Sequence, residues 1–243
     1  MPEPNRRRPR AARHIQIADQ IGRQIVTGEI SPGSALQNMT DLAKSMAVSR
    51  SALREAIKLL AGKGLLEMSP RRGTVVRDRK AWNFFDENVL NWRVGPTLNA
   101  AFLRDLYELR RIIEPEAAAS AAVRATPAML AELERTLERL ERIDPSTAES
   151  VIADVALHQT ILEASGNDFL IALAPAIATC LAMAFSLQRR ACPSRDHFIH
   201  DHGSIVRAIC RGDADEAREF MRRLLRQAEI DATTSLSRKA QDH

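Results

Sequence analysis

The part of this 243-residue chain after residue 98 is an almost unbroken series of helical repeats, which leaves few folds open to it. Apolar side chains recur every three or four residues, and no stretch alternates polar and apolar residues as a strand does. Asp144-Pro145-Ser146, Gly166-Asn167 and Gly212-Asp213 interrupt the pattern. The sequence therefore predicts an all-α bundle of about six helices. We expect them over residues 101–123, 127–143, 148–164, 169–191, 197–211 and 213–236.

The N-terminal third has a different pattern of elements. Ile17, Ile21 and Ile25 recur every four residues in a first helix, and Leu53, Ile57 and Leu60 line one face of a later one. We expect helices over 13–27, 41–46 (capped by Thr40) and 50–64 (capped by Ser49), followed by strands over 65–69 and 74–78. This order predicts a winged helix-turn-helix whose wing is a β-hairpin, so the fold class is mainly α.

Charge divides the chain in the same place as the pattern of elements. Residues 1–80 hold 16 Lys and Arg against 7 Asp and Glu, whereas the rest holds 19 against 24. A basic segment followed by an acidic one indicates one domain that meets a polyanion and a second with another task. We expect a disordered basic arm over residues 1–13, a DNA-binding domain over 14–79, a linker over 80–98 and an all-helical domain over 99–238.

The helix over 50–64 has the residues that reading a DNA groove requires. Arg50 and Arg54 are four residues apart on a face away from the apolar stripe, with Ser49 and Ser51 at the helix start. Arginine suits bidentate contact with guanine, and a helix start with small hydroxyls suits a phosphate. Arg72 and Gly73 form a basic wing tip small enough for a neighbouring groove. Each residue alone is also explained by an ordinary solvated surface; together with the charge they predict DNA binding.

Several other protein classes are disfavoured. The three cysteines show no CxxC spacing, which fits a reducing cytoplasm better than a disulfide scaffold. No apolar stretch follows the basic start MPEPNRRRPRAAR, as it would in a signal peptide. Residues 169–188 are uncharged, but they are rich in alanine and include Pro175. We expect a helix buried on all sides of the bundle there rather than a membrane span.

The DNA-binding segment resembles a known family. IVTGEISPGSAL, LAKSMAVSRSALREAIKLLAGKGLLEMSPRRGTVV and their spacing are similar to the GntR family of bacterial transcription regulators over about residues 14–77. The resemblance implies that Arg50, Arg54, Arg72 and Gly73 contact operator DNA. One departure concerns Thr40, which stands where the family usually has a DNA-contacting arginine.

A candidate metal site lies in the helical part. Asp154 and His158 are spaced i,i+4, so both project from one helix face and can share an ion. ADVALHQTILEASGN and HDHGSIVRAICRGDADEAREFM resemble the FCD ligand-binding domain, which implies His202 as a third ligand for Zn²⁺ or another divalent metal. Leu224 occupies the expected fourth position, so the site is incomplete. The alternative is a buried Asp–His hydrogen bond with no ion.

Two further residues are candidates for effector binding. The segment LYELRRIIEPEAAASAA resembles the first FCD helix, which implies that Arg110 faces the cavity and pairs with the carboxylate of a small organic acid. From spacing alone, a salt bridge from Arg110 to Glu114 is equally expected. Asn167 matches the family's S-G-N motif and either lines the site or caps the next helix.

The segment WNFFDENVLNW gives a hint of the effector. It resembles a W-N-x-x-D-x-x-V-L-x-W segment of the D-galactonate-responsive repressor subgroup, which implies a sugar acid such as an aldonate. The aromatic residues are also explained by packing between domains.

These observations predict a cytoplasmic, homodimeric regulator, a repressor, that binds a palindromic operator and responds to a small carboxylate effector. The alternative from another class is a metal-dependent enzyme that uses Asp154, His158 and His202 around an activated water. The chain has no HExxH motif, nucleophile elbow or Gly-rich phosphate loop, so we do not expect an enzyme.

Overall fold

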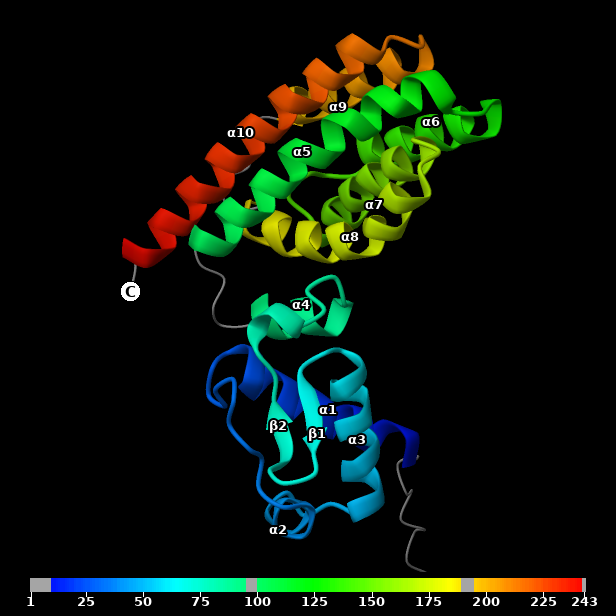
Figure 1. Ribbon diagram of the computed structural model, residues 1–243. Coiled ribbons are helices and arrows are strands. Elements are labelled where there is room, and N and C mark those ends of the chain that lie inside the picture. Colours follow the sequence, from blue (N-terminus) through cyan, green and yellow to red (C-terminus); the bar gives the residue numbers. More distant parts are fainter. Residues whose placement is uncertain (1–9, 95–99, 189–194, 242–243) are drawn as a thin grey trace, which may run out of the picture. The chain divides into compact units, whose positions relative to one another are not determined.

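A computed structural model describes residues 10–94, 100–188 and 195–241 of the chain (Figure 1). The chain divides into two compact units, residues 1–97 and residues 98–243. The described part is mainly helical with one small antiparallel sheet, which confirms the predicted fold class. The expected basic arm lies largely outside the described residues, and the first helix begins at Arg10.

The first unit has the element order of a winged helix-turn-helix. Its elements are α1 (Arg10–Val26), α2 (Met39–Ser45), α3 (Arg50–Gly62), β1 (Leu66–Ser69), β2 (Gly73–Val76), the short 3₁₀ helix η1 (Arg79–Ala81) and α4 (Glu87–Val94). The apolar face of α1 packs against α3, with Ile25, Leu53 and Leu60 fully buried between them. This shared core holds α3 with its other face in solvent.

The sequence predicted the N-cap of α3 correctly and the N-cap of α2 wrongly. Ser49 caps α3 as expected, since its hydroxyl accepts a hydrogen bond from the amide of Ala52. Thr40 does not cap α2. Asn38 does so instead, because its side-chain oxygen accepts from the amides of Thr40 and Asp41 and α2 therefore begins earlier.

The wing is a two-stranded hairpin. β1 and β2 pair antiparallel with Leu66 opposite Val76 and Ser69 opposite Gly73. An isolated bridge between Ala35 and Val75 adds the segment before α2 to the edge of this sheet. The hairpin tip is thus fixed to the same unit as α3.

Residues 80–94, expected to belong to a linker, pack on the first unit. The indole of Trp92 lies so close to α1 that a Cβ at Gly22 would collide with its ring, and its N–H donates to Asp19. Lys63 and Asp86 form an ion pair at 2.7 Å, which joins the same segment to the end of α3. α4 is therefore an integral element of the first unit.

The second unit is a helical bundle. Its helices are α5 (Ala100–Arg124), α6 (Pro127–Arg142), α7 (Ala148–Ala164), α8 (Asp168–Gln188), α9 (Arg195–Cys210) and α10 (Ala214–Gln241). The long helices α5 and α10 run alongside each other (Figure 1), and α5 also contacts α7, α8 and α9. Because α5 touches so many neighbours, polar side chains on its inner face are removed from water.

Helix α8 differs from the expectation that it is buried on all sides. Ala174, Ile177 and Leu181 are buried, but Phe169 is 84 % exposed and Pro175 also faces solvent. The alanine-rich run is uniformly apolar, so its sequence does not show which face packs. No helix in the described ranges combines the length and the hydropathy needed to cross a membrane.

Candidate functional sites

The exposed face of α3 is the first candidate site. Arg50 and Arg54 are both exposed on it, and among the described residues neither forms an ion pair with an acidic side chain. The hydroxyls of Ser49 and Ser51 lie 3.2 Å apart at the start of the helix. The buried residues of α3 face the opposite way, so these polar groups are available to a ligand outside the unit.

The wing places its basic residues at an exposed turn. Arg71 and Arg72 are exposed, and Gly73 adopts a φ of +73°, a left-handed conformation that glycine adopts without steric cost. Thr40 is exposed on α2. All the sequence-predicted DNA-binding residues therefore lie on the surface of one unit.

The second candidate site is a buried cluster in the helical unit. The predicted metal ligands Asp154 and His158 of α7 and His202 of α9 are brought together, with potential ligand atoms within 4.8 Å of one another. The Nε2 atom of His202 lies 2.9 Å from Asp154 Oδ1, and that of His158 lies 3.5 Å from the same oxygen. All three side chains are almost completely buried.

Each imidazole is held from behind by an acceptor. His158 Nδ1 lies 2.7 Å from Oε2 of Glu114 on α5, and His202 Nδ1 lies 2.8 Å from the carbonyl oxygen of Phe198. An acceptor on the Nδ1 side favours a proton there and turns Nε2 toward Asp154. Because the pKa of His158 is raised to about 9, a cation would displace a second proton from its Nε2. In both residues Nε2 is the nitrogen nearer Asp154.

Arg110 extends the cluster on the other side of Glu114. Its Nε donates to Glu114 Oε1 at 2.7 Å, and its Nη2 donates to Oε2 at 3.3 Å. The guanidinium is fully buried and its carbon lies 5.1 Å from the ring centre of Tyr107. The salt bridge that the i,i+4 spacing allowed is therefore present.

Opposite charges determine the protonation of the cluster. Burial alone raises the pKa of Glu114, but Arg110 and His158 outweigh it and lower the pKa to about 2. Burial alone lowers the pKa of His158, whereas Glu114 and Asp154 raise it to about 9. Burial likewise raises the pKa of Asp154, yet the two histidines hold it below its ordinary value. Both carboxylates are thus charged near neutral pH.

The three predicted ligands fit a divalent cation. Asp154 Oδ1 and His202 Nε2 are buried and close, yet neither has a hydrogen bond of acceptable geometry within the described part of the chain. In tetrahedral zinc sites with bonds of about 2.0–2.1 Å, ligand atoms lie about 3.3 Å from one another. The measured separations of 2.9 and 3.5 Å bracket that value.

Three protein ligands leave such a site open. Leu224 is packed in the apolar core with Ile205 and Leu225 rather than completing the cluster. His197 and His200 are exposed, so they do not replace the missing ligand. An ion held here would need a water or a ligand atom in its remaining position.

Asn167 has a local role in the described structure. Its side-chain oxygen accepts a hydrogen bond from the amide of Phe169 at 3.0 Å, in the first turn of α8. The structure therefore shows the capping contact, which is one of the two roles that the sequence left open for Asn167.

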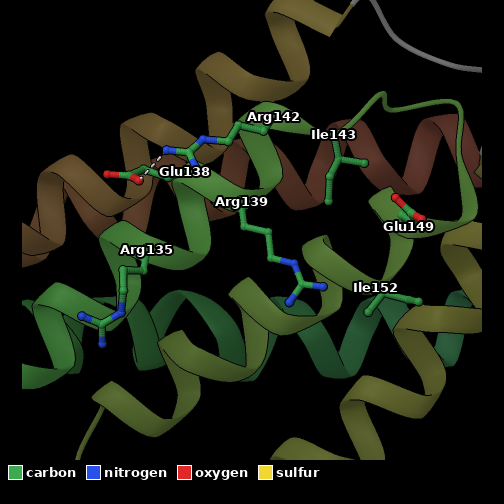
Figure 2. Close-up of a pocket in the computed structure, with 7 residues that line it drawn as sticks. All are labelled: Arg135, Glu138, Arg139, Arg142, Ile143, Glu149 and Ile152. Atoms are coloured by element: carbon green, nitrogen blue, oxygen red, sulfur yellow. Dashed lines mark hydrogen bonds and ion pairs between the residues drawn. The ribbon is translucent and has the colours of Figure 1, made fainter.

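A separate groove opens at the surface between α6 and α7 (Figure 2). Its volume is about 750 Å³, and Arg139 extends into the middle of its lining while Arg142 pairs with Glu138 at one side. None of the buried cluster residues lines this groove. It is lined by Arg135, Glu138, Arg139, Arg142, Ile143, Glu149 and Ile152.

Two members of the buried cluster were not identified as such from the sequence. The i,i+4 spacing predicts Glu114 only as a salt-bridge partner of Arg110, because nothing in the local sequence indicates that His158 of another helix lies beside it. The Phe198 carbonyl is a backbone group, so its role depends on the path of α9 alone.

Comparison with known proteins identifies both units. Residues 14–76 match the model of the bacterial regulatory proteins of the gntR family, and residues 105–227 match the FCD domain. The chain is 30 % identical to the galactonate operon transcriptional repressor of Escherichia coli over 84 % of its length and 90 % of that protein. It is 29 % identical to the HTH-type transcriptional regulator LutR of Bacillus subtilis, over 81 % of this chain and 90 % of that protein.

Solved structures show the same fold. A Listeria monocytogenes structure, described as that of Lar, which controls expression of the agr system, covers 95 % of this chain and 99 % of its own with a TM-score of 0.63 at 19 % identity. A GntR family member from Pseudomonas syringae aligns over 98 % and 92 % with a TM-score of 0.50 at 20 % identity. Because a winged helix with exposed arginines and an FCD domain with a buried polar cluster stand in one chain, the protein belongs to the GntR family: it is a transcriptional regulator and not an enzyme.

Proposed function

We propose that the protein is a homodimeric repressor that binds a palindromic operator and releases it when a small hydroxylated organic acid enters the FCD domain. The observation that carries this proposal is the buried chain of contacts from Arg110 through Glu114 and His158 to Asp154. Such a set of charges is costly to bury, which favours a binding role over a purely structural one.

The DNA-binding half of the proposal is supported by α3 and the wing. Arg50 and Arg54 would read bases in the major groove while Ser49 and Ser51 approach a phosphate at the helix start. Arg72 and Gly73 would approach a neighbouring groove. Two copies related by a two-fold axis would present two such helices to a palindrome.

The effector half is supported by the chemistry of the cluster. Asp154, His158 and His202 would hold Zn²⁺ or another divalent cation, and Arg110, whose charge is balanced by Glu114, would lie beside this site and could turn to the carboxylate of an acid. A cation held there by three side chains would have room for two further oxygens if its shell expands to five, and a carboxylate and an adjacent hydroxyl could supply them together. We therefore propose a 2-hydroxy acid, and a sugar acid such as an aldonate in particular. The galactonate operon repressor among the relatives supports this class. We assign Asn167 only the capping contact.

The control of DNA binding would follow from differential affinity. An acid that binds the FCD domain more tightly in one arrangement of the dimer shifts the protein toward that arrangement. By linkage, the factor by which the acid changes the operator affinity equals the factor by which the operator changes the affinity for the acid. The metal and the acid need not contact DNA for this to happen.

The test is effector-sensitive operator binding. Operators selected from a random DNA library are bound to the zinc-loaded protein, and the complex is titrated with D-galactonate, L-lactate and propionate. We expect a hydroxy acid to weaken the complex and propionate, which lacks the hydroxyl, to leave it intact. If no hydroxy acid binds the protein or changes its operator affinity, the proposed effector class is wrong.

A further inference from the structure

Glu114 occupies a central place in the buried cluster. Its carboxylate accepts two hydrogen bonds from Arg110 on its own helix and lies 2.7 Å from Nδ1 of His158 on α7. Glu114 is almost fully buried, so no water screens these contacts. One side chain therefore serves two partners on two helices.

The contact with Glu114 determines how the His158 imidazole is oriented. Oε2 of Glu114 and Nδ1 of His158 lie at ion-pair distance, 2.7 Å, although outside hydrogen-bond geometry. A negative carboxylate this close favours a proton on the nitrogen that faces it, which is Nδ1. With Nδ1 so occupied, Nε2 is the atom presented toward Asp154.

His202 provides an internal comparison. Its Nδ1 contacts the carbonyl oxygen of Phe198 at 2.8 Å within the same helix, and its Nε2 also approaches Asp154. The two histidines thus have the same orientation, but only one of them owes it to a side chain that can be substituted.

We propose that Glu114 is a positioning residue of the metal centre: its carboxylate fixes the proton of His158 on Nδ1 and directs Nε2 to the ion. This inference rests on the proposed metal site. Acceptors behind metal-binding histidines orient the ring and raise its basicity, and their removal typically lowers metal affinity about 10- to 100-fold.

The Glu114→Gln variant tests the proposal. Glutamine keeps the size of the side chain but loses the charge and replaces one oxygen by an N–H donor, so a donor faces either Arg110 Nε or His158 Nδ1, where an oxygen stands in the wild type. We expect its Zn²⁺ affinity, measured on the metal-free full-length protein by competition with a chelating dye, to fall about 10- to 100-fold. Glu116→Gln is the matched control, because Glu116 lies two residues on, is exposed and pairs with Arg218.

A spectroscopic readout separates positioning from general structure. In the zinc-loaded wild type, ¹⁵N NMR of the histidine rings should show the proton of His158 on Nδ1 and the metal on Nε2. In Glu114→Gln we expect the His158 signals to shift or to divide between forms, while those of His202, held by a backbone carbonyl, stay unchanged. Unchanged signals from His158 together with wild-type affinity would overturn the proposal.

Further variants keep the test decisive. If Glu114→Gln does not fold, Glu114→Asp retains the charge but withdraws the carboxylate, and it too should bind Zn²⁺ more weakly; wild-type affinity would contradict the inference. The His202→Ala variant tests the metal site itself. If wild type does not bind Zn²⁺, or His202→Ala binds it equally well, then the metal site and the inference that rests on it both fail. Loss of affinity in His202→Ala with none in the Glu114 variants overturns the inference alone.

Discussion

Arg50 and Arg110 are the same residue type in opposite surroundings. Arg50 is exposed and, in the described residues, has no acidic partner, whereas Arg110 is fully buried with Glu114 on two of its nitrogens. A guanidinium in water is free to meet a phosphate or a base, while one in a protein interior must be neutralised where it stands. Exposure therefore leaves the first available to the DNA of the proposed function, and burial ties the second to the interior of the FCD domain.

The exposed arginines of α3 should control operator affinity without affecting stability. Removing a bidentate base contact costs about 1–3 kcal/mol, so Arg54→Ala should weaken specific binding about 5- to 150-fold at fixed salt. Its thermal unfolding should match that of wild type, because the side chain makes no ion pair within the described ranges. Lys58→Ala is the control for lost charge on the same exposed helix. Fluorescence anisotropy with selected and scrambled DNA measures the specific and non-specific affinities of both variants. An equal loss of specific affinity in Arg54→Ala and Lys58→Ala would contradict base reading by Arg54.

Thr40 offers a test by gain of function. An arginine at this exposed position on α2 would add one phosphate contact, so Thr40→Arg should raise DNA affinity and steepen its salt dependence by about one unit of slope. Thr40→Gln, a long but uncharged side chain, should leave the slope unchanged. A salt titration of DNA affinity distinguishes the two variants. An unaltered salt dependence in Thr40→Arg would show that position 40 does not reach the phosphate backbone of the DNA.

Single residues also show the limits of prediction from sequence. The spacing of Asp154 and His158 predicted that they share a helix face, because that relation is local. The meeting of Glu114 with His158 depends on how α5 packs against α7, and no local pattern encodes it. Asn38 replaced Thr40 as a cap since both residue types cap helices and the choice depends on where the chain turns.

At the scale of elements, α4 is the main departure from expectation. The aromatic residues of the segment suggested packing between domains, yet Trp82 and Trp92 are buried in the core of the first unit. The helix itself was not expected, since its eight residues include no clear apolar periodicity. Long helices such as α7, by contrast, agreed with the sequence at both ends because threonine and glycine residues flank them.

The contact of α4 with α1 predicts a coupled pair of substitutions. Gly22→Ala should destabilise the first unit by roughly 1–3 kcal/mol, since its Cβ would collide with the Trp92 ring. Trp92→Ala should cost roughly 3–5 kcal/mol through the cavity it leaves. In the Trp92→Ala background, Gly22→Ala should instead stabilise the first unit by up to about 1 kcal/mol, because alanine has the higher helix propensity and the ring it would meet is gone. Denaturant unfolding followed by tryptophan emission, which Trp82 supplies in every variant, measures the cycle; additive effects would contradict the contact.

At the scale of the whole molecule, each unit has its own apolar core, and the two cores differ in what accompanies them. Two tryptophans close the core of the first unit, whereas the second unit also buries three histidine and aspartate side chains between its helices. The change of charge sign near residue 80 in the sequence anticipated this division. What it did not reveal is that residues 80–94 pack with the basic part.

The distribution of aromatic residues allows each unit to be followed separately. Both tryptophans of the chain lie in the first unit, so their emission reports its unfolding, while circular dichroism is dominated by the longer helices of the second. Zn²⁺ at about 100 times its dissociation constant should stabilise the second unit by about 2.7 kcal/mol. We expect the dichroism transition to move and the tryptophan transition to stay. The His202→Ala variant should show no shift, and a shift in tryptophan emission alone would contradict the metal site.

Leucine at position 224 has a consequence for the signals to which such a regulator would respond. A cation bound by only three side chains exchanges with the solution, and an acid that completes its coordination shell raises its affinity for the site. The promoter would then answer to a conjunction of two signals, nutrient and trace element, as a logical AND. Starving the cell of either one would keep the genes silent.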